Sequence, residues 1–149
     1  MSGTISELSA VELTAAIRNR TISAREALVE HLDRIAAVNP VINAVVTLDT
    51  EGAHARAAAA DKLTASGAEL PPLHGLPMTH KDTNNTAGMR TTQGSLVLRD
   101  FVPEVDDLIV ARLKAAGVVT TGKSNVPEFG AGSHTFNELF GTTTNPYAP

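Results

Sequence analysis

The feature that most constrains the fold is a helix that passes directly into a strand in the last third of the chain. Glu104, Asp106 and Asp107 precede apolar residues at helical spacing, and this run ends at Gly117. Acidic side chains are favourable at the positive end of a helix, and glycine is common just beyond its last turn. Residues 118–121 are β-branched and follow at once, which is typical of a strand. With an earlier strand, this order predicts an α/β fold with a mixed, largely parallel sheet flanked by helices.

Two helices are predicted before any strand. Ser9 with Glu12, and Ser23 with Glu26, have the spacing of capping boxes in front of apolar residues at helical spacing. We expect the second helix to end at Pro40, because proline cannot continue the backbone hydrogen bonds of a helix.

A strand and a third helix are predicted next. Residues 41–48 are rich in β-branched side chains, which favours a strand. Asp49 or Thr50 can cap a helix over the alanine-rich residues 51–65, and Gly67 is a natural end for it.

Lys81 is the candidate catalytic residue. It follows an apolar, extended run that begins at Leu76. A lysine at the end of a buried strand can lose its proton by desolvation, and the neutral amine can then act as a base toward a hydroxyl. The alternative is a lysine that reaches solvent beside Asp82, which is the usual situation of lysine. His80 is expected on the face opposite Lys81, and Lys123 is expected to be a structural lysine at the end of a strand.

Composition narrows the function further. Hydrophobic residues make up 42% of the 149 residues, which is enough for one globular core, and a net charge of −4 with few aromatic residues gives no surface for direct nucleic-acid binding. There is no long apolar run and no export signal at the start, so we expect no membrane segment and a cytoplasmic protein. The chain has no cysteine, so a covalent nucleophile must use oxygen or nitrogen. His80 and His134 lack further ligands at metal spacing, and we expect neither a metal nor another cofactor.

The second half of the chain resembles the amidase signature family of serine hydrolases. The resemblance covers about residues 70–149 and depends on the order and spacing of several blocks, namely residues 75–82, 88–95, 107–117, 122–125, 128–129, 137–141 and 145–146. It implies that residues 1–149 are the N-terminal part of a single amidase domain, with a mostly helical lead-in over 1–70 and the start of the catalytic core over 71–149.

The resemblance also implies a mechanism and its residues. In this family a neutral lysine takes a proton through a bridging serine while a second serine attacks the amide carbonyl, and Lys81 matches that lysine. Gly130, Ala131, Gly132 and Ser133 match a wall of the substrate channel. A small-molecule amide is then the substrate, and the resemblance leaves room for a homodimer of the complete protein.

Both serines of the family belong to a motif that follows the block at Asn145 and Pro146. The chain stops there, so we expect them beyond it and the chain alone to be inactive. Ser95, Ser124 and Ser133 are the alternatives within the sequence.

Three functions stay open at this point. The first is an amidase that hydrolyses a carboxylic acid amide to the acid and ammonia or an amine through an acyl-serine intermediate. The second is a glutamine-hydrolysing amidotransferase subunit for tRNA-linked transamidation. The third is a non-catalytic α/β remnant that binds a partner chain.

Overall fold

The centre of the fold is a three-stranded sheet with the order β1-β3-β2. It consists of β1 (Val45–Leu48), β2 (Pro77–Lys81) and β3 (Val119–Ser124) in a computed structural model that describes residues 4–148. The first three residues, where the sequence shows no export signal, and Pro149 lie outside the described residues. β2 runs parallel to β3, and β1 runs antiparallel to it. The mixed α/β architecture predicted from the sequence is therefore confirmed.

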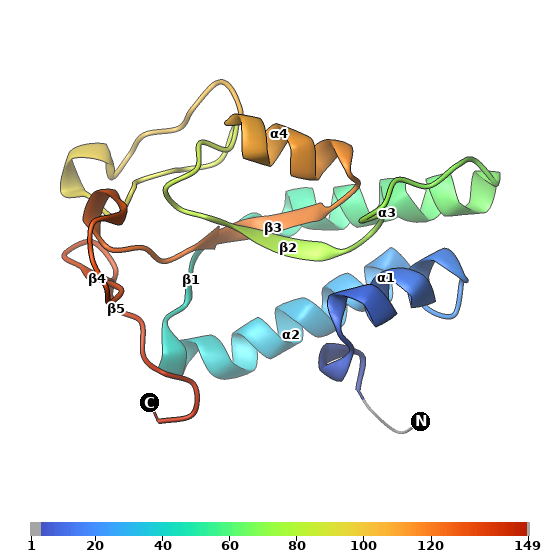
Figure 1. Cartoon of the computed structure of the whole chain (residues 1–149), viewed down its shortest axis with the longest axis horizontal. Helices are drawn as coiled ribbons and strands as arrows, with labels where there is room; N and C mark the ends of the chain where they lie inside the picture. Colours follow the sequence, from blue (N-terminus) through green and yellow to red (C-terminus); the bar gives the residue numbers. More distant parts are fainter. Residues whose placement is uncertain (1–3, 149) are drawn as a thin grey trace.

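Helices lie on both sides of this sheet. Figure 1 shows α1 and α2 on one side and α4 on the other. The α-helices are α1 (Ala10–Arg18), α2 (Ala24–Ile42), α3 (Thr50–Ser66) and α4 (Leu108–Ala115). The short 3-10 helices are Ile5–Glu7, Leu96–Leu98 and Glu128–Gly130, and a small hairpin is formed by β4 (Phe136–Asn137) and β5 (Gly141–Thr142). No helix within residues 4–148 has the length and apolar character needed to cross a bilayer.

The predicted helix starts are confirmed. The side chains of Ser9 and Ser23 accept hydrogen bonds from the backbone N–H groups three residues later, at 3.3 and 3.1 Å, and Asp49 accepts one from Gly52 N at 3.1 Å. Each of these bonds satisfies a backbone donor that the first turn of a helix leaves free.

The end of α2 differs from the prediction. The helix runs through Pro40 to Ile42, and β1 begins only at Val45. Pro40 lies in the last turn, where the loss of one backbone donor disturbs little of the helix. The side chain of Asn39 ends the helix instead: its Oδ1 accepts from the N–H groups of Ala44 and Val45, and its Nδ2 donates to Val45 O, all at 2.8 Å.

The apolar core lies between the sheet and helices α1, α2 and α3. Its buried members are Ile17, Ala24, Ala27, Leu28, Ala53, Ala57 and Val119. Four of these seven are alanines, which let the helices approach one another and the sheet closely, so the layers pack with little side-chain volume between them.

β3 is longer than predicted and contains one extra residue opposite β2. The pairs Met78↔Thr120 and Thr79↔Gly122 leave Thr121 without a partner on β2. Lys123 therefore lies inside the strand, with partners on both sides, rather than at its end. Because cross-strand partners share a face of the sheet, the extra residue places Thr120 and Lys123 on the same face as His80.

Candidate functional site

The last residue of β2 is Lys81, and the chain turns inward directly after it. His80 is buried with 2% of its surface exposed, Lys81 is exposed, and Asp82 is fully buried. The predicted alternation between His80 and Lys81 is therefore present. Within residues 4–148 Lys81 is exposed, so this part of the chain supplies its position but not a dry environment.

On the neighbouring strand β3, Lys123 is the register partner of His80 and is completely buried. Lys123 Nζ donates hydrogen bonds to the backbone oxygen of Asn84 and to the hydroxyls of Thr86 and Thr91, the latter two at 3.0 Å. The carboxylate of Asp82 lies 4.0 Å from the same nitrogen, and both side chains have no exposed surface. Lys123 is thus hydrogen-bonded to the segment that follows Lys81.

The buried pair is shifted toward its neutral forms. Burial lowers the pKa of Lys123 to about 8, against the opposing attraction of Asp82, Asp107 and Asp106. Burial also raises the pKa of Asp82, although hydrogen bonds from the N–H and hydroxyl of Thr92 and the charge of Lys123 favour its carboxylate. Loss of hydration therefore outweighs an attraction that acts over 4.0 Å.

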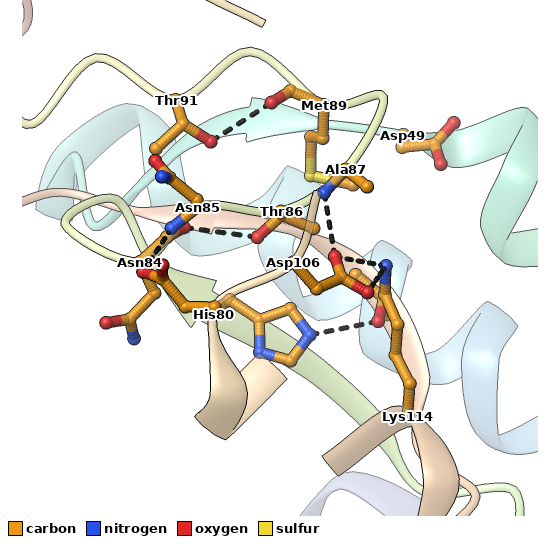
Figure 2. A network of polar contacts seen from close by, with 12 residues as sticks. Asp49, His80, Asn84, Asn85, Thr86, Ala87, Met89, Thr91, Asp106 and Lys114 are labelled. Carbon is orange, nitrogen blue, oxygen red and sulfur yellow. Dashed lines mark hydrogen bonds and ion pairs between the residues drawn. The ribbon is translucent and has the colours of Figure 1, made fainter. Parts of the chain in front are cut away.

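Two carboxylates also make hydrogen bonds to the backbone of the segment that follows Lys81. Asp107 accepts from Asn85 N at 2.8 Å, and Asp106 accepts from Ala87 N at 2.7 Å and from Lys114 Nζ at 2.8 Å. Figure 2 shows Asp106 between Ala87 and Lys114. These two carboxylates precede α4, so that helix and the loop after β2 are joined.

His80 lies next to these groups on the face of β2 below the loop (Figure 2). Its Nε2 is 3.0 Å from Thr120 Oγ1. Burial, then the positive charges of Lys123 and Lys114, lower the pKa of His80 to about 4. The imidazole is therefore neutral near pH 7 and acts as a packed, hydrogen-bonded core residue.

Backbone hydrogen bonds connect the end of β3 to a loop further along the chain. Asp82 N donates to Ser124 O, Gln93 N donates to Asp82 O, and Phe129 N donates to Gln93 O, at 3.0, 3.1 and 2.7 Å. Gln93 and Phe129 have φ angles of 52° and 53°, a region that is strained for residues other than glycine. Such strain persists only where surrounding contacts enforce it, and it is common at functional sites.

A pocket of about 790 Å³ opens beside this linked backbone. Its lining residues come from three stretches of chain, namely Gly94–Val97, residues 127–134 without Gly130, and residues 136–138. Of the predicted channel wall, Ala131, Gly132 and Ser133 line the pocket. Gly130 lies just outside it, and a Cβ added there would be 3.3 Å from Thr83 Cγ2. The wall segment and the segment after Lys81 are therefore neighbours.

The alternative serines occupy three different environments. Ser95 is fully buried, and its hydroxyl donates to Glu128 Oε1 at 2.7 Å. Ser133 is exposed in the pocket, and Ser124 is the register partner of Lys81. In the described part of the chain, no three His, Asp or Glu side chains gather to hold a metal ion.

Sequence reasoning missed the buried cluster of Lys123, Asp82, Thr86 and Thr91. One local signal was available, because Lys123 stands within a run of β-branched and small residues, where a solvated lysine is unusual. Its partners are 32 to 41 residues away in sequence, and no local pattern identifies them.

Comparison with known proteins places this geometry in a family. A model of the amidase family matches residues 26–149. The chain is 45% identical over 139 residues to a glutamyl-tRNA(Gln) amidotransferase subunit from Acidothermus cellulolyticus, and the match covers 93% of this chain and 28% of that protein.

Solved structures agree with the family match. The native peptide amidase of Stenotrophomonas maltophilia matches with a TM-score of 0.86 and 34% identity over 95% of this chain and 30% of its own. A vestigial protein complex connected with the origins of an s-triazine catabolic enzyme matches with a TM-score of 0.90 and 38% identity, covering 94% and 31%.

The chain spans less than a third of the length of each of these proteins. The match nevertheless includes most of the chain. It contains the β2 strand with Lys81 and the loop of residues 127–134 beside the pocket, which we call the pocket loop. The chain therefore belongs to the amidase family.

Proposed function

We propose that this chain carries the general-base lysine of an amidase, which hydrolyses a carboxylic acid amide to the acid and ammonia or an amine. Lys81 is the proposed base, and Gly130, Ala131, Gly132 and Ser133 are the proposed wall of the substrate channel. Residues 1–149 then form the N-terminal part of one catalytic domain. A cytoplasmic location belongs to the same proposal.

One observation carries the proposal: Lys81 is exposed at the end of β2, where the loop after it and the pocket loop are neighbours. A base must reach the hydroxyl that it deprotonates. An exposed amine fixed at the end of a strand can do so for a serine supplied by further chain packed against this face. That chain would also remove water from the amine, and desolvation favours the neutral form that accepts a proton.

The chemical steps follow from the triad that the family resemblance implies. The proton of the attacking serine passes through the bridging serine to the lysine amine. The oxygen of the attacking serine forms a bond to the amide carbon. The C–N bond breaks as the nitrogen leaves with a proton, and water then cleaves the acyl-serine ester. Backbone N–H groups that hold the developing oxyanion contribute a large part of such rate enhancements.

A second candidate is the glutamine-hydrolysing subunit of a tRNA amidotransferase. It is favoured by relatives of 41 to 46% identity, such as those of Thiobacillus denitrificans and Streptomyces coelicolor, which are also glutamyl-tRNA(Gln) amidotransferase subunits. In that case the amide is glutamine, and the protein works with further subunits.

The test is ammonia release by the gene product that contains this chain. Glutamine, short aliphatic amides and aryl amides are offered separately, and Lys81→Ala is compared with Lys62→Ala, since Lys62 is a likewise exposed lysine on α3. We expect Lys81→Ala to lower kcat by at least about 1,000-fold and Lys62→Ala to leave it unchanged. Activity on glutamine alone selects the second candidate. A wild-type protein inactive on every amide, or a fully active Lys81→Ala variant, contradicts the proposal.

A further inference from the structure

We propose that Lys123 is a positioning residue for Lys81: its buried ammonium group fixes the segment of residues 82–92, and this segment fixes both the end of β2 and the pocket loop. The inference rests on the proposed role of Lys81 as the base. It assigns a role to the ammonium group of Lys123, which takes no part in the chemical steps described above.

The hydrogen bonds of Lys123 match the three donors of an ammonium group. It donates to Asn84 O, Thr86 Oγ1 and Thr91 Oγ1, which uses all three N–H bonds. Each of the two hydroxyls then donates to a backbone oxygen of the same segment, Thr86 to Asn84 at 3.2 Å and Thr91 to Met89 at 3.0 Å. Figure 2 shows both of these bonds as dashed lines. One cation therefore orders a loop that has no regular secondary structure of its own.

Stability alone is a poor reason to bury this pair. Removing two charges from water is unfavourable for each ion, and well-packed apolar side chains often stabilise a core as much or more. Here the two groups are 4.0 Å apart without a hydrogen bond between them, and Asp82 Oδ1 has no hydrogen-bond partner among residues 4–148. A costly pair with imperfect compensation is better explained by the geometry that it imposes.

That geometry reaches the proposed site through the backbone. Asp82 follows Lys81 directly and is bonded to Ser124 O through its N–H and to Gln93 N through its carbonyl. Gln93 O in turn accepts from Phe129 N at the start of the pocket loop. A shift of Asp82 would therefore move the base and the pocket together.

The experiment uses the gene product that contains this chain and a double variant, Lys123→Met with Asp82→Asn. The double variant removes both charges, so no unpaired charge is left in the core, and it also removes the three donors of the ammonium group. A matched control, Arg25→Met with Asp61→Asn, removes an ion pair of 2.8 Å between α2 and α3. For each protein, kcat and KM on its best amide are measured, together with hydrogen exchange of the backbone amides of Asp82, Gln93 and Phe129.

In the double variant we expect kcat to fall about 100-fold with KM within about twofold, because a misplacement of about 1 Å costs this much. Exchange at the three amides should be at least about tenfold faster, since local opening becomes easier. The control should match the wild type in both measurements. A purely structural role predicts lower stability with an unchanged kcat in the folded protein.

A milder variant keeps the inference testable if the double variant does not fold. Thr91→Val keeps the shape of the side chain but removes one acceptor of Lys123, and we expect about a tenfold lower kcat with the fold intact. Wild-type kcat and exchange in whichever of the two variants folds would overturn the inference. The proposed function fails separately, if the wild-type protein releases no ammonia from any amide.

Discussion

A buried imidazole next to two lysines makes the stability of this protein depend on pH. The pKa of His80 is about 4 in the folded chain and about 6.5 when unfolded. The fold therefore favours the neutral form, so this contribution to stability is complete above pH 6.5, decreases as the pH falls below that value, and is lost once the pH has fallen through about 4. A difference of this size corresponds to about 3 kcal/mol.

Between pH 7 and pH 4, the free energy of unfolding decreases in the wild type partly because His80 resists protonation in the folded state. We expect this decrease to be smaller by about 3 kcal/mol in the His80→Gln variant. Glutamine can keep a hydrogen bond to Thr120 and does not titrate. Urea unfolding at the two pH values measures the effect. His54→Gln is the control, because His54 is exposed on α3, and this variant should behave as the wild type. Equal pH dependence in His80→Gln and wild type would show that the imidazole of His80 is not held neutral by the fold.

The orientation of His80 and Lys81 could be predicted from the sequence, whereas the burial of Lys123 could not. The opposite orientation of His80 and Lys81 follows from the alternation of a strand, and it is present in the structure. The burial of Lys123 does not follow, because it depends on the extra residue Thr121 in β3 and on acceptors in a loop far away in sequence. Propensity and periodicity describe neighbours along the chain, whereas this site is made by tertiary contacts.

At the level of secondary-structure elements, the junction between α2 and β1 depends on one side chain. Asn39 makes three hydrogen bonds, two of them to backbone N–H groups that have no helical partner there. Asn39→Ala leaves these groups unsatisfied in a partly buried position, so we expect a loss of about 2 kcal/mol in the free energy of unfolding. Denaturant unfolding measures it, and Asn19→Ala, at the exposed end of α1, should change it by less than about 0.5 kcal/mol. Equal values for the two variants would mean that other contacts hold the junction.

The same junction explains why helix starts were predicted better than this helix end. A capping box is complete within four residues, so Ser9 and Ser23 could be identified from sequence alone. The end of α2 is decided by the competition between Pro40, which disfavours the helix, and the Asn39 side chain, which permits one more turn before β1. The β-branched residues Val41 and Ile42 suit a strand, but the helix includes both.

In the whole molecule, the two halves of the chain share one sheet. β1, from the mostly helical first half, pairs with β3 along one side, and β2 pairs along the other. Arg56 of α3 adds hydrogen bonds to Thr120 O of β3, at 2.8 and 3.1 Å. The sequence predicted the strands and the class of the sheet, but their order could not be predicted because β3 joins two strands that lie far before it in the chain.

At Gly122 the backbones of β1 and β3 approach each other closely, and this approach provides a test of how the two halves of the chain are joined. A Cβ at Gly122 would lie 2.0 Å from Thr47 O and 3.1 Å from Leu48 Cα, both backbone atoms of β1. No rotamer change can relieve such a clash, so in Gly122→Ala the strand β1 must move away from β3 and lose its pairing.

We expect Gly122→Ala to lower the free energy of unfolding by about 3 kcal/mol or more. Gly88→Ala is the matched control: Gly88 has a φ of 74° but nothing within 4 Å of the added Cβ, so only backbone strain of about 1 to 2 kcal/mol is expected. Urea unfolding followed by circular dichroism compares the two. If β1 is required to hold the first half on the sheet, Gly122→Ala should also unfold less cooperatively, because α2 and α3 lose the strand between them. Equal stability and equal cooperativity of the two variants would mean that β1 contributes little and that the helices alone join the two halves of the chain.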